Sequence, residues 1–347
     1  MRPLLLLLAA VALAASTRAA AAQSEKPLEI QIIDVEGGQA TLVVSPTGES
    51  LLVDTGYPGL NGRDADRIAA AVKQAGLSRI DYLVITHYHA DHVGGVPALA
   101  ARVPIRTFVD HGATVEQGDG PSGLYNAYVE ARAKGRHVVA RPGGSLPMAG
   151  LEVHLVSAAG DVITKPLPGA GAPNALCRDF KPMNPDPSEN ARSVGMVFVF
   201  GNFRMLDLGD LTWNKEEGLV CPNNLLGTVD VYLTSHHGLN QSGSAALVHA
   251  VHPRVAVMNN GAKKGGMPSA WRIIEDSPGL EDLWQLHYAV DAGADHNVPG
   301  PFIANLDETT AHGIHITAQR DGRFVVTNAR NGQSKTYPPR RALAARP

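Results

Sequence analysis

The sequence predicts a mixed α/β domain in which short β-strands alternate with helices. Short apolar runs rich in branched residues, such as residues 28–32 and 81–85, have the length and pattern of strands. Between them, residues 63–76 carry apolar side chains at the spacing of a helix that ends at a glycine. A chain of 347 residues with 44% hydrophobic and 18% charged residues is able to bury a sizeable core as one soluble domain.

The other elements follow in order, and no linker or internal repeat divides the chain. Further strands are expected at residues 40–44, 51–53, 105–109, 151–156, 193–200, 203–208, 229–234, 255–258, 313–318 and 323–327. Further helices are expected at residues 96–103, 123–134 and 245–251. Stretches rich in proline, glycine and polar residues predict insertions at about 160–190 and 262–301, and residues 331–347 are expected to form a flexible tail.

The first 22 residues have the pattern of a signal peptide. A positively charged start is followed by an apolar run and by the small residues Ala20, Ala21 and Ala22, which predicts export to the periplasm or the medium. The run is short for a membrane helix, so no integral membrane domain is expected, although an uncleaved anchor is the alternative. Loss of Arg2 and Arg18 takes the formal charge from −3 to −5, which argues against a broad basic surface for polyanions.

Two cysteines, Cys177 and Cys221, are the only ones in the chain. In an exported protein they are able to form one disulfide, because the compartment is oxidising. The sequence leaves open whether their Cα atoms come close enough.

The densest group of potential metal ligands follows the strand at residues 81–85. His87, His89, Asp91 and His92 lie within six residues, and the glycines at 94 and 95 let the chain turn away at once. Imidazoles at alternate positions can face one metal ion, while the carboxylate and the next imidazole can face a second.

These residues form the motif HxHxDH and resemble the signature of the metallo-β-lactamase-fold hydrolases. The resemblance extends over residues 28–330 and implies a four-layer αββα sandwich, here a single elaborated domain at 27–330. It also implies a site for one or two metal ions, usually zinc, with manganese or iron as alternatives.

The same resemblance assigns roles to residues at several strand ends. It implies that His87 and His89 hold a first metal, that Asp91 and His92 hold a second, and that Asp210 bridges both. Asp54 is expected to hydrogen-bond a ligand histidine and fix its orientation. One of His236 and His237 would complete the second metal's ligands, with His236 preferred because it comes first, and the other would donate to the substrate. Asp91 would also orient the nucleophilic water and accept its proton.

No sequence motif identifies the third ligand of the first metal. Many related hydrolases carry a GHxPGH segment before the bridging aspartate, and none occurs between His92 and Asp210. His111, His137 and His154 are the histidines in that interval, and His111 ranks first because it ends a strand.

Segments at residues 34–39, 52–56, 190–193, 208–210 and 235–238 more particularly resemble the metallo-hydrolase domain of ComEC-type competence proteins. That group is associated with degradation of a DNA strand, but this chain lacks its channel segments and has Met267-Pro268 where the group tends to place His-Pro. The leading prediction is therefore an exported metallo-hydrolase that acts on a phosphodiester or related ester, of small-molecule or nucleotide type. The alternatives are a lactonase, thioesterase or β-lactamase, and an inactive metal-binding or partner-binding module. The oligomeric state stays open.

The loop at residues 259–266 carries two adjacent cations, Lys263 and Lys264. A solvated loop is the expected structure. Binding of an anionic substrate group by the lysines is the alternative.

Overall fold

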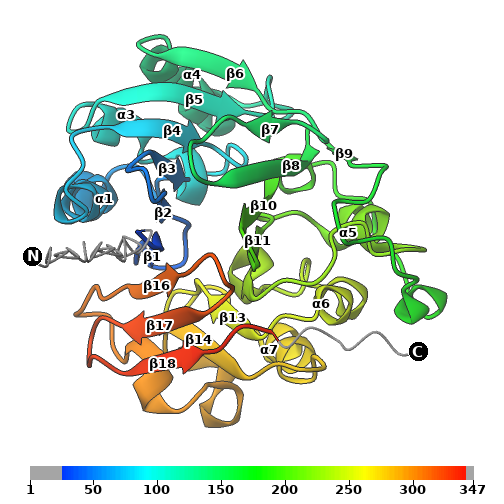
Figure 1. Cartoon of the computed structure of the whole chain (residues 1–347). Helices are drawn as coiled ribbons and strands as arrows, with labels where there is room; N and C mark the ends of the chain where they lie inside the picture. Colours follow the sequence, from blue (N-terminus) through cyan, green and yellow to red (C-terminus); the bar gives the residue numbers. More distant parts are fainter. Residues whose placement is uncertain (1–25, 341–347) are drawn as a thin grey trace, which may run out of the picture.

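Two β-sheets pack face to face in the computed structural model, which describes residues 26–340 (Figure 1). The expected signal peptide at residues 1–22 lies outside the described residues. The layer between the sheets is apolar and contains side chains from both, among them Ile30 and Val53 from one sheet and Phe198 and Trp284 from the other. Burial of this shared face stabilises the pairing of the sheets because its area is removed from water.

The first sheet has the strand order β18-β17-β16-β1-β2-β3-β4-β5-β6. Its strands are β1 (Leu28–Ile32), β2 (Thr41–Val44), β3 (Ser50–Val53), β4 (Ile80–Val84), β5 (Ile105–Asp110), β6 (Arg136–Val139), β16 (Ile314–Ala318), β17 (Phe324–Asn328) and β18 (Ser334–Tyr337). β3 to β6 are parallel, and the other neighbours are antiparallel. In β1 the alternate residues Leu28, Ile30 and Ile32 are buried, as the period-2 pattern predicts.

The second sheet has the order β15-β14-β13-β12-β11-β10-β8-β7, and β9 pairs with β8 outside this path. Its strands are β7 (Ser145–Leu146), β8 (Glu152–Ala158), β9 (Asp161–Val162), β10 (Gly195–Phe200), β11 (Phe203–Asp207), β12 (Val231–Leu233), β13 (Val255–Met258), β14 (Asp282–His287) and β15 (Ile303–Asn305). β11 to β15 are parallel, so their carboxyl ends lie at one edge.

Helices cover the outer face of each sheet and complete four layers (Figure 1). The helices on the first sheet are α1 (Arg63–Gln74), α2 (Ala90–Val93), α3 (Val96–Ala100) and α4 (Asp119–Arg132). Those on the second are α5 (Trp213–Val220), α6 (Ala245–Val251) and α7 (Pro268–Glu275). Short 3₁₀ turns are η1 (Leu60–Gly62), η2 (Ala175–Arg178), η3 (Glu189–Arg192), η4 (Ser235–Gly238), η5 (Val290–Ala292), η6 (Ala294–His296) and η7 (Gly300–Phe302). The predicted αββα architecture is confirmed.

Two expectations about the outlying segments are wrong. The supposed insertion at 262–301 contains α7 and β14, and β14 pairs with β13 on one side and β15 on the other. The supposed tail beyond residue 330 contains β18, which pairs with β17. Both strands lie among polar and glycine residues, which concealed their pattern in the sequence.

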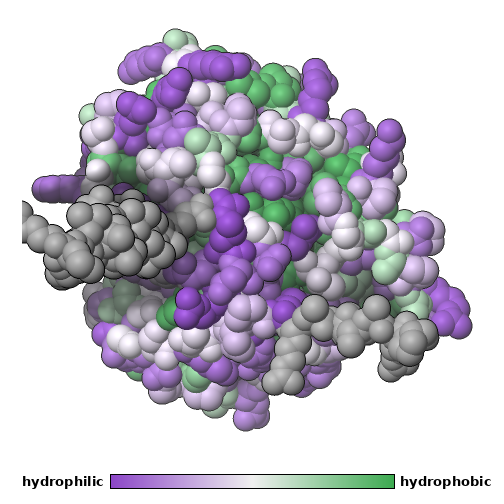
Figure 2. All heavy atoms as spheres, viewed as in Figure 1, coloured by the Kyte–Doolittle hydropathy of each residue, from purple (hydrophilic) through white to green (hydrophobic). Residues whose placement is uncertain are grey.

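The first expected insertion, residues 160–190, is largely irregular, and a disulfide bond joins it to the rest of the domain. Cys177 and Cys221 form a disulfide with their Cα atoms 5.6 Å apart, which joins this segment to the end of α5. Within residues 26–340, no helix is both long enough and apolar enough to cross a bilayer. Figure 2 shows hydrophilic side chains spread widely over one face, with hydrophobic ones between them.

Buried Glu216 in α5 ties two helices together. Its carboxylate accepts hydrogen bonds from the amides of Gly243 and Ser244, at 2.6 and 2.8 Å, just before α6 begins. Burial raises the pKa of Glu216 to about 7, although these hydrogen bonds oppose the rise. The unfolded chain therefore releases this proton at a lower pH than the folded chain.

We expect the Glu216 carboxyl to make the protein less stable as pH rises from 5 to 8. Folding is favoured while the group is protonated, and this contribution of about 3 kcal/mol is lost as the pH passes through the folded-state pKa. Urea unfolding at each pH unit should show a smaller decline for Glu216→Gln than for the wild type. Equal declines in the two proteins would contradict this assignment.

Candidate metal centre

His92 is held in one orientation by buried partners. Its Nδ1 lies 2.7 Å from Asp54 Oδ2, and the same carboxylate accepts hydrogen bonds from the Thr86 hydroxyl and the Thr86 amide at 2.7 and 2.8 Å. A proton on Nδ1 is donated to Asp54, which leaves the Nε2 lone pair free to bind a cation. Asp54 thus contacts a candidate ligand in the way the sequence analysis expected.

Nε2 of His92 belongs to a cluster of side chains from three segments, each of which follows a different strand. The ligand atoms of Asp91, His92, Asp210 and His237 all lie within 4.8 Å of one another, and all four residues are buried. The His92 and His237 Nε2 atoms are 3.2 Å apart, and His237 Nε2 lies 3.1 Å from Asp91 Oδ2. Asp210 closes the group, with Oδ2 3.2 Å from His92 Nε2 and Oδ1 3.5 Å from His237 Nε2.

Further imidazoles approach the Asp210 oxygen that His92 contacts. Nε2 of His87 is 3.0 Å from Nδ1 of His89 and 3.8 Å from Asp210 Oδ2. His236 approaches the same oxygen, with Nε2 3.4 Å from Asp210 Oδ2. Asp210 is therefore approached by four imidazoles, three at Oδ2 and one at Oδ1, as a carboxylate that bridges two ions would be.

The two adjacent histidines separate because the backbone between them is left-handed. His236 and His237 have φ of 54° and 56°, a region that costs roughly 1–3 kcal/mol for a residue with a side chain. The ring centroids are 6.2 Å apart, with planes at 71°. The structure thus corrects the preference for His236 beside Asp91 and His92, since His237 occupies that place.

The neighbouring loop permits this turn only because it contains glycine. A Cβ atom on Gly265 would collide with the carbonyl oxygen of His237. Instead, the amide of Gly266 donates to that oxygen at 2.9 Å. Close backbone approach therefore fixes the position of His237.

The donor set fits one or two divalent cations. Within the described part of the chain, Asp210 Oδ1 is buried with no hydrogen-bond partner. Such an orphaned oxygen in a cluster of imidazoles and carboxylates is explained by a ligand, and nitrogen and oxygen donors of this kind suit zinc, manganese or iron.

Burial and neighbouring charges shift the pKa values in this cluster. Burial and the charge of His92 hold the pKa of His87 well below its ordinary value. Burial would raise the pKa of Asp210, but the imidazoles of His92 and His237 outweigh it and hold that pKa well below its ordinary value. Burial would also raise the pKa of Asp91, but neighbouring groups, chiefly the His92 imidazole, hold that pKa well below its ordinary value. Both carboxylates are therefore ionised near neutral pH.

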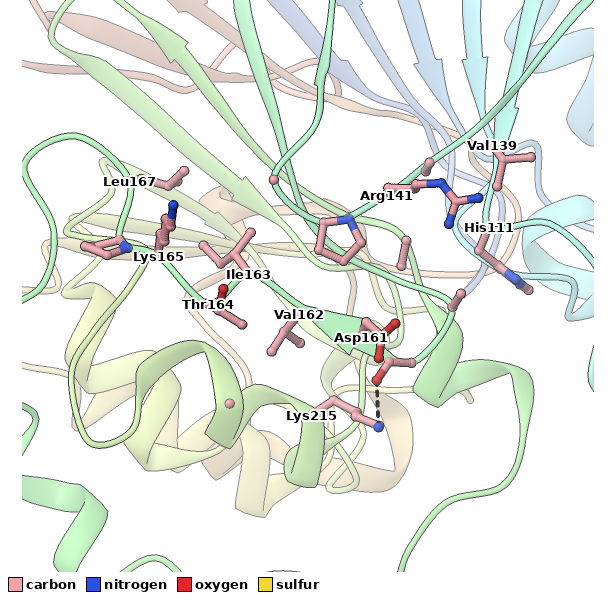
Figure 3. Close-up of a pocket in the computed structure, with 18 of the residues that line it drawn as sticks. His111, Val139, Arg141, Asp161, Val162, Ile163, Thr164, Lys165, Leu167 and Lys215 are labelled. Atoms are coloured by element: carbon pink, nitrogen blue, oxygen red, sulfur yellow. Dashed lines mark hydrogen bonds between the residues drawn. The ribbon is translucent and has the colours of Figure 1, made fainter.

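His111 contacts a different partner. Its Nε2 lies 2.7 Å from Oε2 of buried Glu189, which also accepts hydrogen bonds from the Thr114 hydroxyl and the Val115 amide. His111 lines a pocket of about 960 Å³ and lies at the side of it opposite Leu167 (Figure 3). The expectation that His111 is the third ligand of the first metal thus stays a prediction without a supporting contact, and the geometry favours His236.

Two residues beside the cluster, Glu116 and Asn190, were not identified from sequence as site residues. Glu116 Oε1 lies 2.9 Å from His89 Nε2, and the Asn190 amide nitrogen lies 3.5 Å from His236 Nε2. Lys264 Nζ contacts Asp91 Oδ2, so the expectation of a solvated loop is wrong for this lysine. The sequence had one signal for Asn190, since it lies in the segment 190–193 that resembles ComEC-type domains.

Comparison with known proteins agrees with the metallo-β-lactamase fold. Residues 33–172 match the family model described as the metallo-beta-lactamase superfamily. The chain is 41% identical over 63 residues to a hydroxyacylglutathione hydrolase of Stenotrophomonas maltophilia, covering 18% of this chain and 21% of that protein. It is 25% identical over 229 residues to the competence protein ComA of Neisseria gonorrhoeae, covering 65% of this chain and 26% of that protein.

The chain therefore spans about a fifth to a quarter of the length of these two relatives. Among solved structures, it is similar to the metallo-beta-lactamase fold protein YhfI of Bacillus subtilis, with 11% identity, a TM-score of 0.47, and coverage of 75% of this chain and 95% of that one. The diiron β-hydroxylase CmlA of Streptomyces venezuelae gives 17% identity and a TM-score of 0.40, covering 75% of this chain and 48% of that one.

We expect Asp54→Asn to lower the affinity for zinc by about 10–100-fold. Asparagine tolerates the left-handed backbone at this position, where φ is 59°, so the fold should persist. The side-chain N–H of the asparagine would donate to Nδ1 of His92. The ring proton would then lie on Nε2, where it blocks the nitrogen that faces the metal site. Titration calorimetry with zinc measures the change. Asp66→Asn, at an exposed pair with Arg102, is the control, and equal affinities in the two variants would refute the role of Asp54.

Proposed function

We propose that this chain is an exported, metal-dependent hydrolase that acts on a phosphodiester or a related ester. One observation carries the proposal: separate strand ends bring Asp91, His92, Asp210 and His237 within 4.8 Å. The match to the metallo-beta-lactamase superfamily over residues 33–172 supports a hydrolytic reaction.

The geometry supports a division of the ligands between two ions. His87, His89 and His236 would hold the first, and Asp91, His92 and His237 would hold the second, with Asp210 between them. Zinc is the proposed metal, with manganese or iron as alternatives. Ions held there would supply a nucleophilic water near neutral pH and withdraw negative charge from the reacting bond.

Asp91 has a second proposed role as the group that orients the attacking water and accepts its proton. It is 8% exposed, so it is the least buried member of the four-residue cluster. Its carboxylate is ionised near neutral pH, as acceptance of a proton requires. His237, which the sequence analysis offered as a proton donor, is now proposed as a ligand because its Nε2 faces Asp91 and His92.

Export is proposed from the pattern of residues 1–22, and the disulfide between Cys177 and Cys221 supports it, since such bonds persist in oxidising compartments. A substrate of small-molecule or nucleotide type is proposed. The similarity to a hydroxyacylglutathione hydrolase favours a thioesterase as the second candidate function, although it covers 18% of this chain.

We expect Asp91→Asn to reduce turnover by at least about 100-fold while the fold is retained, because the variant loses both a ligand and a proton acceptor. The mature protein should hydrolyse bis-p-nitrophenyl phosphate when zinc or manganese is present, and circular dichroism checks the fold. A lactone, a thioester and a chromogenic cephalosporin test the alternatives. Metal binding with no turnover on any of these substrates would favour a binding module.

We expect the wild-type protein to bind two zinc ions per chain and His236→Ala to bind one. Removal of the third imidazole leaves the first ion with too few protein ligands. His111→Ala, which removes a buried contact with Glu189 outside the four-residue cluster, is the matched variant and should keep both ions. Mass-spectrometric metal analysis after gel filtration measures the content. Loss of an ion in His111→Ala alone would restore the original assignment.

A further inference from the structure

Two adjacent lysines of the same loop have different surroundings. The Lys263 side chain is 68% exposed and pairs with Glu308 at 2.9 Å on the surface. The Lys264 side chain is 32% exposed, and its ammonium contacts Asp91 Oδ2 in the metal centre. Lys264 is thus a cation placed at the site, while its neighbour is an ordinary surface residue.

Tyr57 is a second contact of the Lys264 ammonium. The Lys264 Nζ donates to the Tyr57 hydroxyl at 3.2 Å and lies 5.4 Å from the centre of the ring. An aromatic face attracts a cation without neutralising it. The Lys264 ammonium therefore keeps its positive charge beside Asp91, and its side chain, 32% exposed, is accessible to a ligand of the centre.

The backbone of the loop is fixed against the opposite sheet. The amide of Gly261 donates to the carbonyl of Lys264 at 2.9 Å, which closes a tight turn. A Cβ atom on Gly37 would lie 3.0 Å from the Cβ of Lys264, and one on Gly261 would lie 2.7 Å from the carbonyl oxygen of Glu36. These close approaches leave the loop little room to move, so Lys264 extends from a rigid base.

An anionic substrate gains from such a cation. The Lys264 ammonium contacts Asp91 and reduces the negative charge that this carboxylate presents to a phosphate oxygen, in addition to the attraction of any bound metal ions. Charge-assisted hydrogen bonds from lysine to phosphate oxygens are among the stronger polar contacts in proteins. A neutral ester gains much less from the same group.

We propose that Lys264, positioned by Tyr57, binds the anionic oxygen of the substrate and so selects charged phosphodiesters over neutral esters. This inference rests on the proposed function and specifies the substrate class of that site. Lys264 acts by binding and takes part in no bond-breaking step. Lys263 has no share in it, because its exposed ammonium contacts Glu308 and no residue of the metal centre.

Steady-state kinetics on the zinc-loaded protein test the selection. For bis-p-nitrophenyl phosphate, Lys264→Met should raise KM by about 10-fold or more, as loss of a hydrogen bond to a charged group predicts. Turnover of the neutral ester p-nitrophenyl acetate should fall less than turnover of the diester. Loss of the contact with Asp91 affects both substrates, whereas loss of the bond to the anionic oxygen affects only the diester. Lys264→Arg should restore most of the diester affinity, and Lys263→Met should match the wild type. Equal losses on the charged and the neutral substrate would overturn the proposal.

Binding of inorganic phosphate provides a readout that needs no turnover. Titration calorimetry should show about 10-fold weaker binding to Lys264→Met than to the wild type or Lys263→Met. The zinc content of each variant, measured in parallel, must be equal, which excludes an effect through lost metal. If no protein turns over any substrate, the proposed function fails, and the phosphate affinities still decide the inference. Unchanged binding in Lys264→Met, or no phosphate binding by the wild type, would refute it.

Discussion

The burial of two neighbouring carboxylates is the constraint on which the rest of the structure depends. Asp91 and Asp210 are 8% and 2% exposed, and an isolated charge in such surroundings is strongly destabilising. The fold offsets this cost with the imidazoles of His92 and His237, which come from different sheets. The strand ends of both sheets are therefore positioned by electrostatic attraction as well as by the apolar layer between them.

The two flanks of the centre differ in charge. Beside Asp91, Lys264 and Tyr57 supply a cation and a hydroxyl. Beside His236, the Asn190 amide is uncharged and borders a pocket of about 620 Å³ that Trp213 also lines. A substrate with one charged and one neutral end would therefore have a preferred direction across the ions.

Sequence predicted the layers of the fold better than their edges. The central strands have apolar runs that periodicity identifies, whereas β14 and β18 lie in polar, glycine-containing segments and gain their stability from neighbours in the sheet. Tertiary pairing of this kind leaves little trace in local composition.

In the site, too, residues close together in sequence were predicted, whereas contacts between distant segments were not. His87, His89, Asp91 and His92 are close in sequence, so their common loop was evident from spacing alone. The roles of His236 and Lys264 depend on contacts with segments far away in the chain, and each has an identical neighbour with other contacts: His237 faces Asp91, and Lys263 pairs with Glu308. Residue type cannot separate such neighbours, because backbone direction decides which side chain enters the centre.

The paired left-handed residues at His236 and His237 have a mechanical consequence. One peptide unit carries an imidazole for each half of the centre, so the two halves are joined by covalent bonds rather than by packing. A shift of that unit large enough to loosen one ion would displace the donor of the other.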